Sequence, residues 1–144
     1  MNKTFVRIML VVVLLVPPSA IYVVYRIAKK EQAAKLATWE GIEPAAVPRV
    51  TDEAKIIAGG YAYQQHCGTC HGPDGQGGLG KALNHAGLAG EPGHAYLMTV
   101  LANGIPNTPM VPWKGVLSPD EAAAVAAHVQ TFVPAAPAEP EAAE

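Results

Sequence analysis

The residues with the most distinctive chemistry are two cysteines and a histidine in the stretch Cys67-Gly68-Thr69-Cys70-His71. The chain has 144 residues, and these are its only two cysteines. Two thiols at this spacing can each add across a vinyl group of one haem, and the histidine that follows can ligate the iron. The spacing therefore predicts one covalently attached haem c, bound through Cys67 and Cys70, with His71 as an axial ligand.

Two other kinds of site use a pair of cysteines at this spacing. A structural zinc site needs about four ligands, and here only loosely spaced histidines accompany the thiols. A thiol redox pair is typical of a βαβ context, whereas the chain shows no strand pattern. Thiol redox chemistry is kept as an alternative to haem attachment.

A second iron ligand is expected from the proline-rich residues 106–113. The prolines hold the backbone extended, which leaves the flexible thioether of Met110 free to reach an iron. Met98 is a competitor, but it lies in an apolar helical segment where a methionine usually only packs. The remaining candidates are the histidines His85, His94 and His128.

The composition indicates one small folded domain joined to a more apolar segment. Half of the residues are hydrophobic and 15% are charged, with a formal net charge of -2. Residues 1–49 carry seven basic and three acidic side chains, whereas residues 50–133 carry three basic and six acidic ones. The domain therefore lacks the basic patch that nucleic-acid binding requires.

The apolar excess lies at the amino terminus, in an almost unbroken run from Phe5 to Ile27. About 23 residues at about 1.5 Å each make a helix that crosses the ~30 Å core of a bilayer once. Pro17 and Pro18 are expected to kink this helix. A cleavable signal peptide is the alternative, but residues 21–25 remain apolar beyond the small-residue cleavage site. We therefore expect a single transmembrane helix.

Four segments follow from this pattern. Residues 1–40 are expected to form the membrane anchor helix and its extension, because residues 28–39 favour helix and are charged. Glycine and prolines then predict a linker over residues 41–50. The haem domain covers residues 51–133, and residues 134–144, rich in Pro, Ala and Glu, form a disordered tail.

Three helices are predicted in the haem domain, over residues 51–66, 94–103 and 118–132. Thr51 can cap the first helix, and Gly104 can end the second. The third has the clearest start, with Ser118 as cap, Pro119 at the first helical position and Glu121 in a capping box. The glycines between residues 72 and 93 predict a loop. The domain is therefore expected to be all helix and loop.

With these motifs in place, residues 50–133 resemble the class I cytochrome c family. The stretch Cys67-Gly68-Thr69-Cys70-His71-Gly72 matches its haem motif, and Met110-Val111-Pro112-Trp113 resembles its distal loop. Gly59 and Tyr63 occupy the positions of a glycine and an aromatic residue that cross the carboxy-terminal helix in that family. On that helix, His128 stands where the family commonly has tyrosine.

The resemblance implies an all-α fold, with three to four short helices around one haem, preceded by the single amino-terminal transmembrane helix. It implies thioethers from both cysteines and iron ligation by His71 and Met110, with Tyr63 and Trp113 among the residues that bind the cofactor. It also implies that the protein is an electron carrier and not itself an enzyme. A histidine and methionine ligand pair favours the reduced iron and raises the potential.

The resemblance further implies a location. Because the family's haem is attached after export, the haem domain is expected on the periplasmic face of the cytoplasmic membrane. The basic residues beyond the apolar run outnumber those before it, against the usual bias of positive charge toward the cytoplasm. These basic residues are Arg26, Lys29, Lys30 and Lys35. Contact of the first three with anionic lipid or with an acidic partner helix would account for their clustering.

The function that follows is electron transfer in a respiratory or photosynthetic chain. The expected partners are the bilayer, through residues 5–27, and a quinol-oxidising complex or a terminal oxidase or reductase. The protein would be a fixed haem subunit of such a complex or a shuttle tethered by residues 41–50. The alternative is a haem enzyme or sensor with an open distal site, in which His85 or His94 would act on peroxide or a small gas.

Overall fold

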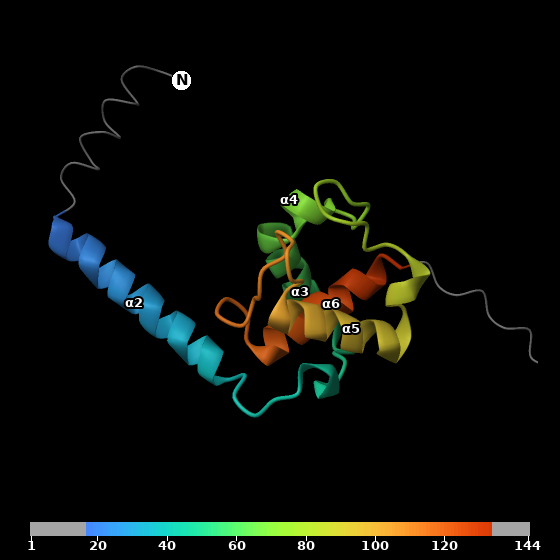
Figure 1. Ribbon diagram of the computed structural model, residues 1–144, viewed down its shortest axis with the longest axis horizontal. Coiled ribbons are helices and arrows are strands. Elements are labelled where there is room, and N and C mark those ends of the chain that lie inside the picture. Colours follow the sequence, from blue (N-terminus) through green and yellow to red (C-terminus); the bar gives the residue numbers. More distant parts are fainter. Residues whose placement is uncertain (1–16, 134–144) are drawn as a thin grey trace, which may run out of the picture. The chain divides into compact units, whose positions relative to one another are not determined.

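The computed structural model describes residues 17–133, and every regular element in that part of the chain is a helix. The prediction of an all-helical protein is thus confirmed for these residues. By internal contacts the chain divides into two units, Met1–Ala34 and Lys35–Glu144, which are described separately. The elements are α2 (Pro18–Ala37), η1 (Pro44–Ala46), α3 (Glu53–His66), α4 (Gly68–His71), η2 (Ala86–Leu88), α5 (Gly90–Asn103) and α6 (Pro119–Thr131), as labelled in Figure 1.

Most of the first unit's described residues belong to α2, which buries none of its side chains. Its apolar residues between Ile21 and Ile27 are all more than half exposed. Within residues 17–133, no helix combines the length and the apolar character needed to cross a membrane. The predicted span Phe5–Ile27 begins outside the described residues. The predicted kink at Pro17 and Pro18 also depends on residues before Pro17, which lie outside them. The predicted tail, residues 134–144, also lies outside them.

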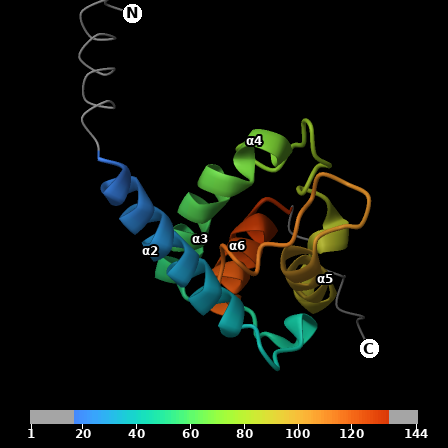
Figure 2. The ribbon, with the colours of Figure 1, turned by 60° about the vertical axis from the view of Figure 1, so that its left-hand side comes forward.

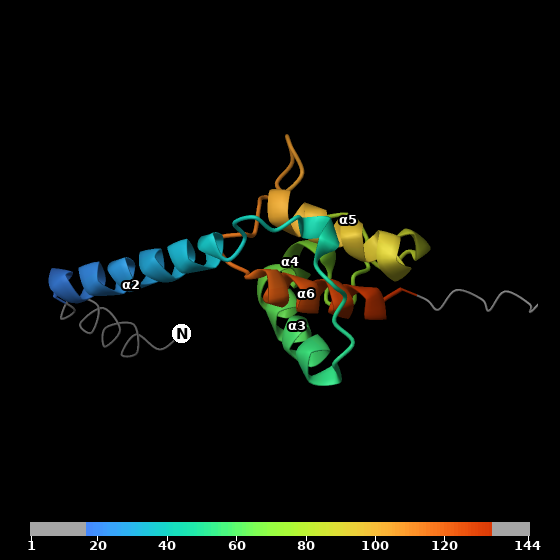
Figure 3. The same cartoon turned by 90° about the horizontal axis from the view of Figure 1, so that it is seen from below.

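The second unit is built on the crossing of α3 and α6, which Figure 3 shows from below. Small residues allow the two backbones to approach, because a methyl group at Gly59 would overlap the carbonyl oxygen of Ala124. Six consecutive residues of α6, from Ala122 to Ala127, are buried, and five of them are alanines. The expected close crossing at Gly59 is therefore confirmed, and α6 is the central helix of the domain.

The helix ends largely follow the sequence signals. As predicted, α3 ends at His66, α5 ends before Gly104, and Ser118 and Glu121 form a capping box at the start of α6. The predicted cap of α3 is wrong. Asp52, and not Thr51, caps this helix, because its carboxylate accepts a hydrogen bond from the backbone N–H of Lys55 at 2.9 Å.

The start of α5 differs from the prediction by four residues. The helix begins at Gly90, within the stretch for which glycine and proline predict a loop. Pro92 is tolerated there because the first turn of a helix needs no partner for that backbone nitrogen. Gly93 is required for packing, since a methyl group would overlap the carbonyl group of Leu88.

The predicted linker, residues 41–50, lies against the domain. Pro44 and Val47 are buried, and η1 packs on α5. The buried imidazole of His94 on α5 bonds the carbonyl oxygen of Val47 through Nε2 at 2.9 Å. On the other side of α5 a long loop, orange in Figure 2, runs through residues 104–118 and returns to α6.

Candidate haem site

The haem motif forms a single helical turn at the end of α3. Cys67 ends α3 and begins α4, and the N–H groups of Cys70 and His71 both bond the carbonyl oxygen of Cys67, at 3.0 and 2.9 Å. Neither cysteine is in a disulfide; the Cys67 side chain is buried and Cys70 is exposed. One short turn therefore presents two free thiols and the histidine. No helix is predicted from the sequence at these residues, and the structure adds this turn.

The imidazole of His71 is held in one orientation by the loop that follows it. Its Nδ1 atom lies 2.7 Å from the carbonyl oxygen of Lys81. A carbonyl can only accept, so Nδ1 carries the proton and Nε2 keeps a free lone pair. The backbone of Gly80 also packs closely against the ring, since a methyl group at this glycine would lie 2.7 Å from His71 Cε1. His71 is therefore oriented in the way that metal-ligating histidines usually are.

The loop after α4 is folded back onto the motif by its own backbone. The N–H of Gly77 donates to the carbonyl oxygen of His71 at 2.7 Å, and that of Gly80 donates to Cys70 at 2.8 Å. Gly77 has a φ of 91°, a conformation that side chains other than glycine rarely adopt. The glycines that indicate only a loop in the sequence thus build the support of the histidine.

Met110 lies at the edge of the core, half-buried against the cluster that contains Cys67. Its backbone is held within its own loop, because its carbonyl accepts from the N–H of Ile105 at 2.9 Å and its N–H donates to Thr108 Oγ1 at 3.2 Å. Met98, the competing thioether, is fully buried in the core cluster. Of these two methionines, the half-buried Met110 is the one whose thioether a ligand can reach.

The three candidate histidines have different surroundings. His85 is exposed, whereas His94 is almost fully buried and bonded to the carbonyl of Val47. His128 packs its ring against Tyr63 and Phe132, with centroid distances of 5.6 and 4.9 Å. In the structure His94 and His128 serve packing between helices.

Trp113 connects the loop of residues 104–118, which carries Met110 and is called the methionine loop, to the haem motif. Its ring lies 5.4 Å, centroid to centroid, from the ring of His66, the residue before Cys67. The indole nitrogen Nε1 of Trp113 is buried and has no hydrogen-bond partner. A buried N–H without an acceptor is costly, so it indicates a missing group that accepts hydrogen bonds.

These residues fit a haem. Its vinyl groups suit the two free thiols, its iron suits the free Nε2 of His71 and a thioether, and its propionates are acceptors of the kind that the Trp113 N–H lacks. The contact of Trp113 with the cofactor stays a prediction, as does that of Met110 and of the motif residues.

Tyr63 supports the motif from within the core. It is fully buried, and its hydroxyl donates to the carbonyl oxygen of Gly72 at 2.7 Å, directly after the motif. Burial raises the pKa of Tyr63 to about 12, so the hydroxyl keeps its proton. Tyr63 thus ties α3 to the loop that holds His71, while its contact with the cofactor stays a prediction.

Thiol redox chemistry has less support from the geometry. Burial, and then the charge of Cys70, raise the pKa of the Cys67 thiol to about 11. A reactive cysteine needs a lowered pKa, because the thiolate is the nucleophile. Within residues 17–133, no three or more His, Cys, Asp and Glu side chains are arranged to hold a metal ion.

A helical domain with a thiol pair, an oriented histidine and a half-buried methionine defines the class of c-type cytochromes. Comparison with known families agrees. The family model described as "Cytochrome C oxidase, cbb3-type, subunit III" matches residues 54–129, more than half of the chain. The chain therefore belongs to this family, and its cofactor is covalently bound haem c.

Three curated relatives are similar over part of their length. Cytochrome c55X of Pseudomonas aeruginosa is 52% identical over 58 residues, which are 40% of this chain and 48% of the relative. Cytochrome c55X of Paracoccus denitrificans is 38% identical over 69 residues, 48% of this chain and 66% of the relative. Cytochrome c55X of Stutzerimonas stutzeri is 42% identical over 59 residues, 41% of this chain and 51% of the relative. The chain thus spans about half to two thirds of the length of these relatives.

Proposed function

We propose that this protein is a membrane-anchored mono-haem cytochrome that transfers electrons on the periplasmic face of the cytoplasmic membrane. The observation that carries the proposal is the hydrogen bond from His71 Nδ1 to the carbonyl of Lys81, because it leaves Nε2 free in a fixed direction. The haem, when bound, supplies an iron that takes up and gives back one electron. The residues of the chain attach it, orient it and limit access to it.

Attachment falls to the two cysteines. Each thiol would add across one vinyl group, so that a sulfur–carbon bond forms and the thiol hydrogen goes to the neighbouring carbon. The first expected site, Cys67, is buried and the second, Cys70, is exposed. Denaturing electrophoresis with haem staining, followed by mass spectrometry, tests the attachment. A chain of unmodified mass with both thiols free to alkylate would contradict it.

Axial ligation decides between electron transfer and chemistry on a substrate. If His71 and Met110 both ligated the iron, no position on it would be open, and the default role would be electron transfer. Fast binding of carbon monoxide to the reduced protein would instead favour the alternative of an open distal site for peroxide or a small gas.

The membrane anchor is proposed from the apolar run Phe5–Ile27. Its described end supports the proposal, because the apolar side chains of α2 between Ile21 and Ile27 are all more than half exposed. Gentle detergent extraction tests the anchor. Release of the full-length chain by salt alone, without detergent, would count against it.

A fixed subunit is favoured over a swinging shuttle. The predicted linker would have to be free for swinging, yet Pro44 and Val47 are buried in the domain. The family's description names an oxidase subunit, so a terminal oxidase is the proposed partner. Purification after mild extraction distinguishes the two versions, since a subunit brings stoichiometric partners and a shuttle comes alone.

A further inference from the structure

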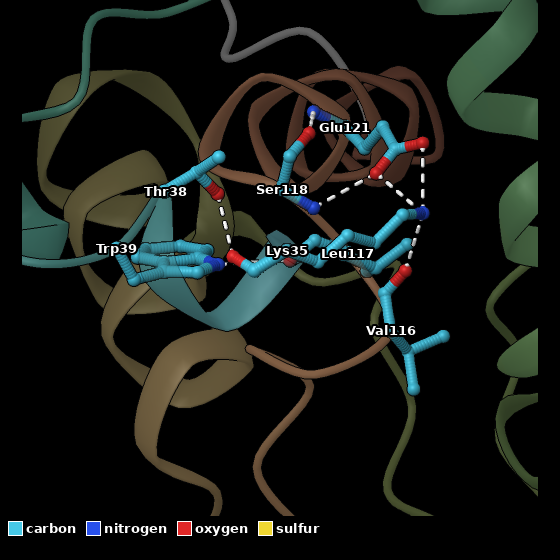
Figure 4. Close-up of polar contacts among 7 residues, drawn as sticks. All are labelled: Lys35, Thr38, Trp39, Val116, Leu117, Ser118 and Glu121. Atoms are coloured by element: carbon cyan, nitrogen blue, oxygen red, sulfur yellow. Dashed lines mark hydrogen bonds and ion pairs between the residues drawn. The ribbon is translucent and has the colours of Figure 1, made fainter. Parts of the chain in front are cut away.

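The last residues of α2 and the two residues that follow contact the end of the methionine loop and the start of α6, and they lie outside both the haem motif and the family match. This segment, residues 35–39, is called the brace. The ammonium of Lys35 donates to the carbonyl oxygen of Val116 at 2.7 Å and to both carboxylate oxygens of Glu121, at 3.1 and 3.0 Å. The indole N–H of Trp39 donates to the carbonyl oxygen of Leu117 at 2.8 Å. Figure 4 shows these contacts together.

The two carbonyl groups belong to the turn that ends the methionine loop. Inside this turn, the N–H groups of Val116 and Leu117 both donate to the carbonyl oxygen of Trp113 at 2.8 Å. The carbonyl groups of the same two residues accept hydrogen bonds from the brace. Trp39 and Leu117 are only 5% and 4% exposed, so water cannot readily replace the indole as donor.

This turn anchors the loop on the carboxy-terminal side of Met110. The N–H of Trp113, three residues after Met110, donates to the carbonyl oxygen of Leu101 at 2.8 Å. Met110 itself bonds only within residues 105–110, a part of the loop that is otherwise exposed. The brace adds a further contact to the turn, because the ammonium of Lys114 lies 5.6 Å from the centroid of the Trp39 ring.

We propose that the brace is a positioning element for the axial methionine. By holding the turn of residues 113–117, Lys35 and Trp39 keep the Met110 thioether at the iron. The brace lies outside the family match, which begins at residue 54. The inference rests on the proposed function, because it requires Met110 to ligate the haem iron.

A purely structural role of the same segment would give a different pattern, and Arg49 provides the matched control. Its guanidinium bonds Gln130 Oε1 at 3.1 Å through Nε and lies 3.7 Å from Glu91 Oε1 through Nη1. These contacts also tie the amino-terminal side of the domain to its helices, but they do not involve residues 104–118. Replacing Arg49 removes the same charge as replacing Lys35.

The experiment uses the full-length, haem-loaded protein with the substitutions Trp39→Phe, Lys35→Met and Arg49→Met. Three quantities are measured: the sulfur-to-iron charge-transfer absorption of the ferric protein on heating, helical circular dichroism on heating, and carbon monoxide binding to the reduced protein. We expect Trp39→Phe to lose the absorption well before the helices unfold and to bind carbon monoxide about tenfold faster, because a buried carbonyl loses its donor. Lys35→Met is expected to do the same more weakly, and Arg49→Met to leave both readings as in the parent protein.

Several outcomes would overturn the proposal. If absorption and helix signal are lost together in Trp39→Phe and Arg49→Met alike, the brace only stabilises the domain. If Trp39→Phe does not fold, Lys35→Met decides, since its substitution removes only contacts of a partly exposed side chain. If the parent protein shows the absorption and both brace variants keep it unchanged, the brace does not position Met110, and the proposed function stands. If the haem-loaded parent lacks the absorption, Met110 is not a ligand, and both the brace proposal and the proposed function fail.

Discussion

The haem motif and the methionine loop, the two halves of the candidate site, are fixed by contacts of different range. Around the motif the supports are local: His71 bonds the carbonyl of Lys81, ten residues away, and Gly80 bonds that of Cys70. The turn that ends the methionine loop is held by Trp39 and Lys35, separated from their partners by between 78 and 86 positions.

This difference separates what can form early from what depends on the finished fold. Local contacts close short loops at little entropic cost, whereas long-range contacts form only when the helices have already assembled. The histidine side is therefore expected to be rigid wherever the motif folds. The methionine side is expected to loosen first when the domain is perturbed.

Removal of the methionine is the strongest test of this division. Met110→Ala should keep the haem, attached through the thiols and His71, while the ferric protein loses its sulfur-to-iron absorption and the reduced protein binds carbon monoxide. Axial ligands set haem potentials over a range of about 0.8 V, so we expect the reduction potential to fall by roughly tenths of a volt. Potentiometric titration measures it.

The matched control is Met98→Leu in the buried core. This substitution conserves volume and should cost less than about 1.5 kcal/mol of stability, with little change in potential. Equal potentials in Met110→Ala and the parent protein would mean that Met110 does not ligate the iron.

Overpacking the histidine side tests its rigidity. In Gly80→Ala the new methyl would lie 2.7 Å from His71 Cε1, and the ring cannot turn away because Nδ1 is bonded to Lys81. We expect a loss of about 1–3 kcal/mol in the free energy of unfolding and a lower yield of haem-loaded protein. Denaturant unfolding measures the first and haem staining the second.

Gly87→Ala is the control for this substitution. Its nearest neighbour is the ring of His85, which is exposed and free to move. If the two glycine variants unfold alike, the loop around His71 yields more easily than its contacts indicate.

The histidine side is also the half that could be predicted from sequence. Its chemistry is carried by adjacent residues. Helix signals elsewhere in the domain, such as the capping box of Ser118 and Glu121, likewise act over three residues. The sequence could not predict how the imidazole of His71 is held in place. The glycines after His71 indicate a loop, but not that this loop fixes the imidazole through the carbonyl of Lys81.

The support of the methionine side could not be predicted, because its partners are far apart in sequence. Residues 28–39 favour an extension of the anchor helix, and nothing local shows that Trp39 is buried against Leu117. A single tryptophan in an otherwise charged stretch is the one available signal. Likewise, the prolines and glycine of residues 41–48 indicate a linker, although Val47 is bonded to His94 of α5.

Lowering the pH should affect the two halves of the site in separate pH ranges. The histidine side should respond first, through His128, which packs against Tyr63. Its Nε2 atom is buried without a partner, beside Tyr63, and burial lowers the pKa of His128 below its ordinary 6.5. Between the pKa of His128 in the folded protein and 6.5, the unfolded chain binds more protons than the folded one. The contribution of His128 to stability is therefore complete above pH 6.5 and declines below it, by less than about 1.4 kcal/mol per pH unit. The midpoint of thermal unfolding at pH 5 to 8 measures the decline.

His128→Phe should flatten this part of the curve, because it keeps a ring beside Phe132 and removes the nitrogen that resists protonation. Contributions that both proteins share cancel in the comparison. Curves that stay parallel between pH 8 and pH 5 would assign the decline to another group.

The methionine side should respond only at lower pH, through Glu121. Burial alone would raise the pKa of this carboxyl, but the backbone N–H of Ser118 and the ammonium of Lys35 together lower it below 4.5. Its contribution is therefore complete above about pH 4.5 and is lost as the pH falls further. Glu121→Gln should remove this acid step, measured as the loss of sulfur-to-iron absorption between pH 5 and 3.

Protonation of Glu121 should change the free energy of unfolding by at most about 1 kcal/mol, the smallest effect among these predictions. The reason is that the side chains of Lys35 and Glu121 are 28% and 48% exposed. Protonation of Glu121 also leaves the bond from Lys35 to the carbonyl of Val116 intact. Lys35→Met removes both contacts, so it should loosen the methionine loop more at pH 7 than Glu121→Gln does. The reverse order would show that the ion pair, and not the carbonyl contact, holds this end of the loop.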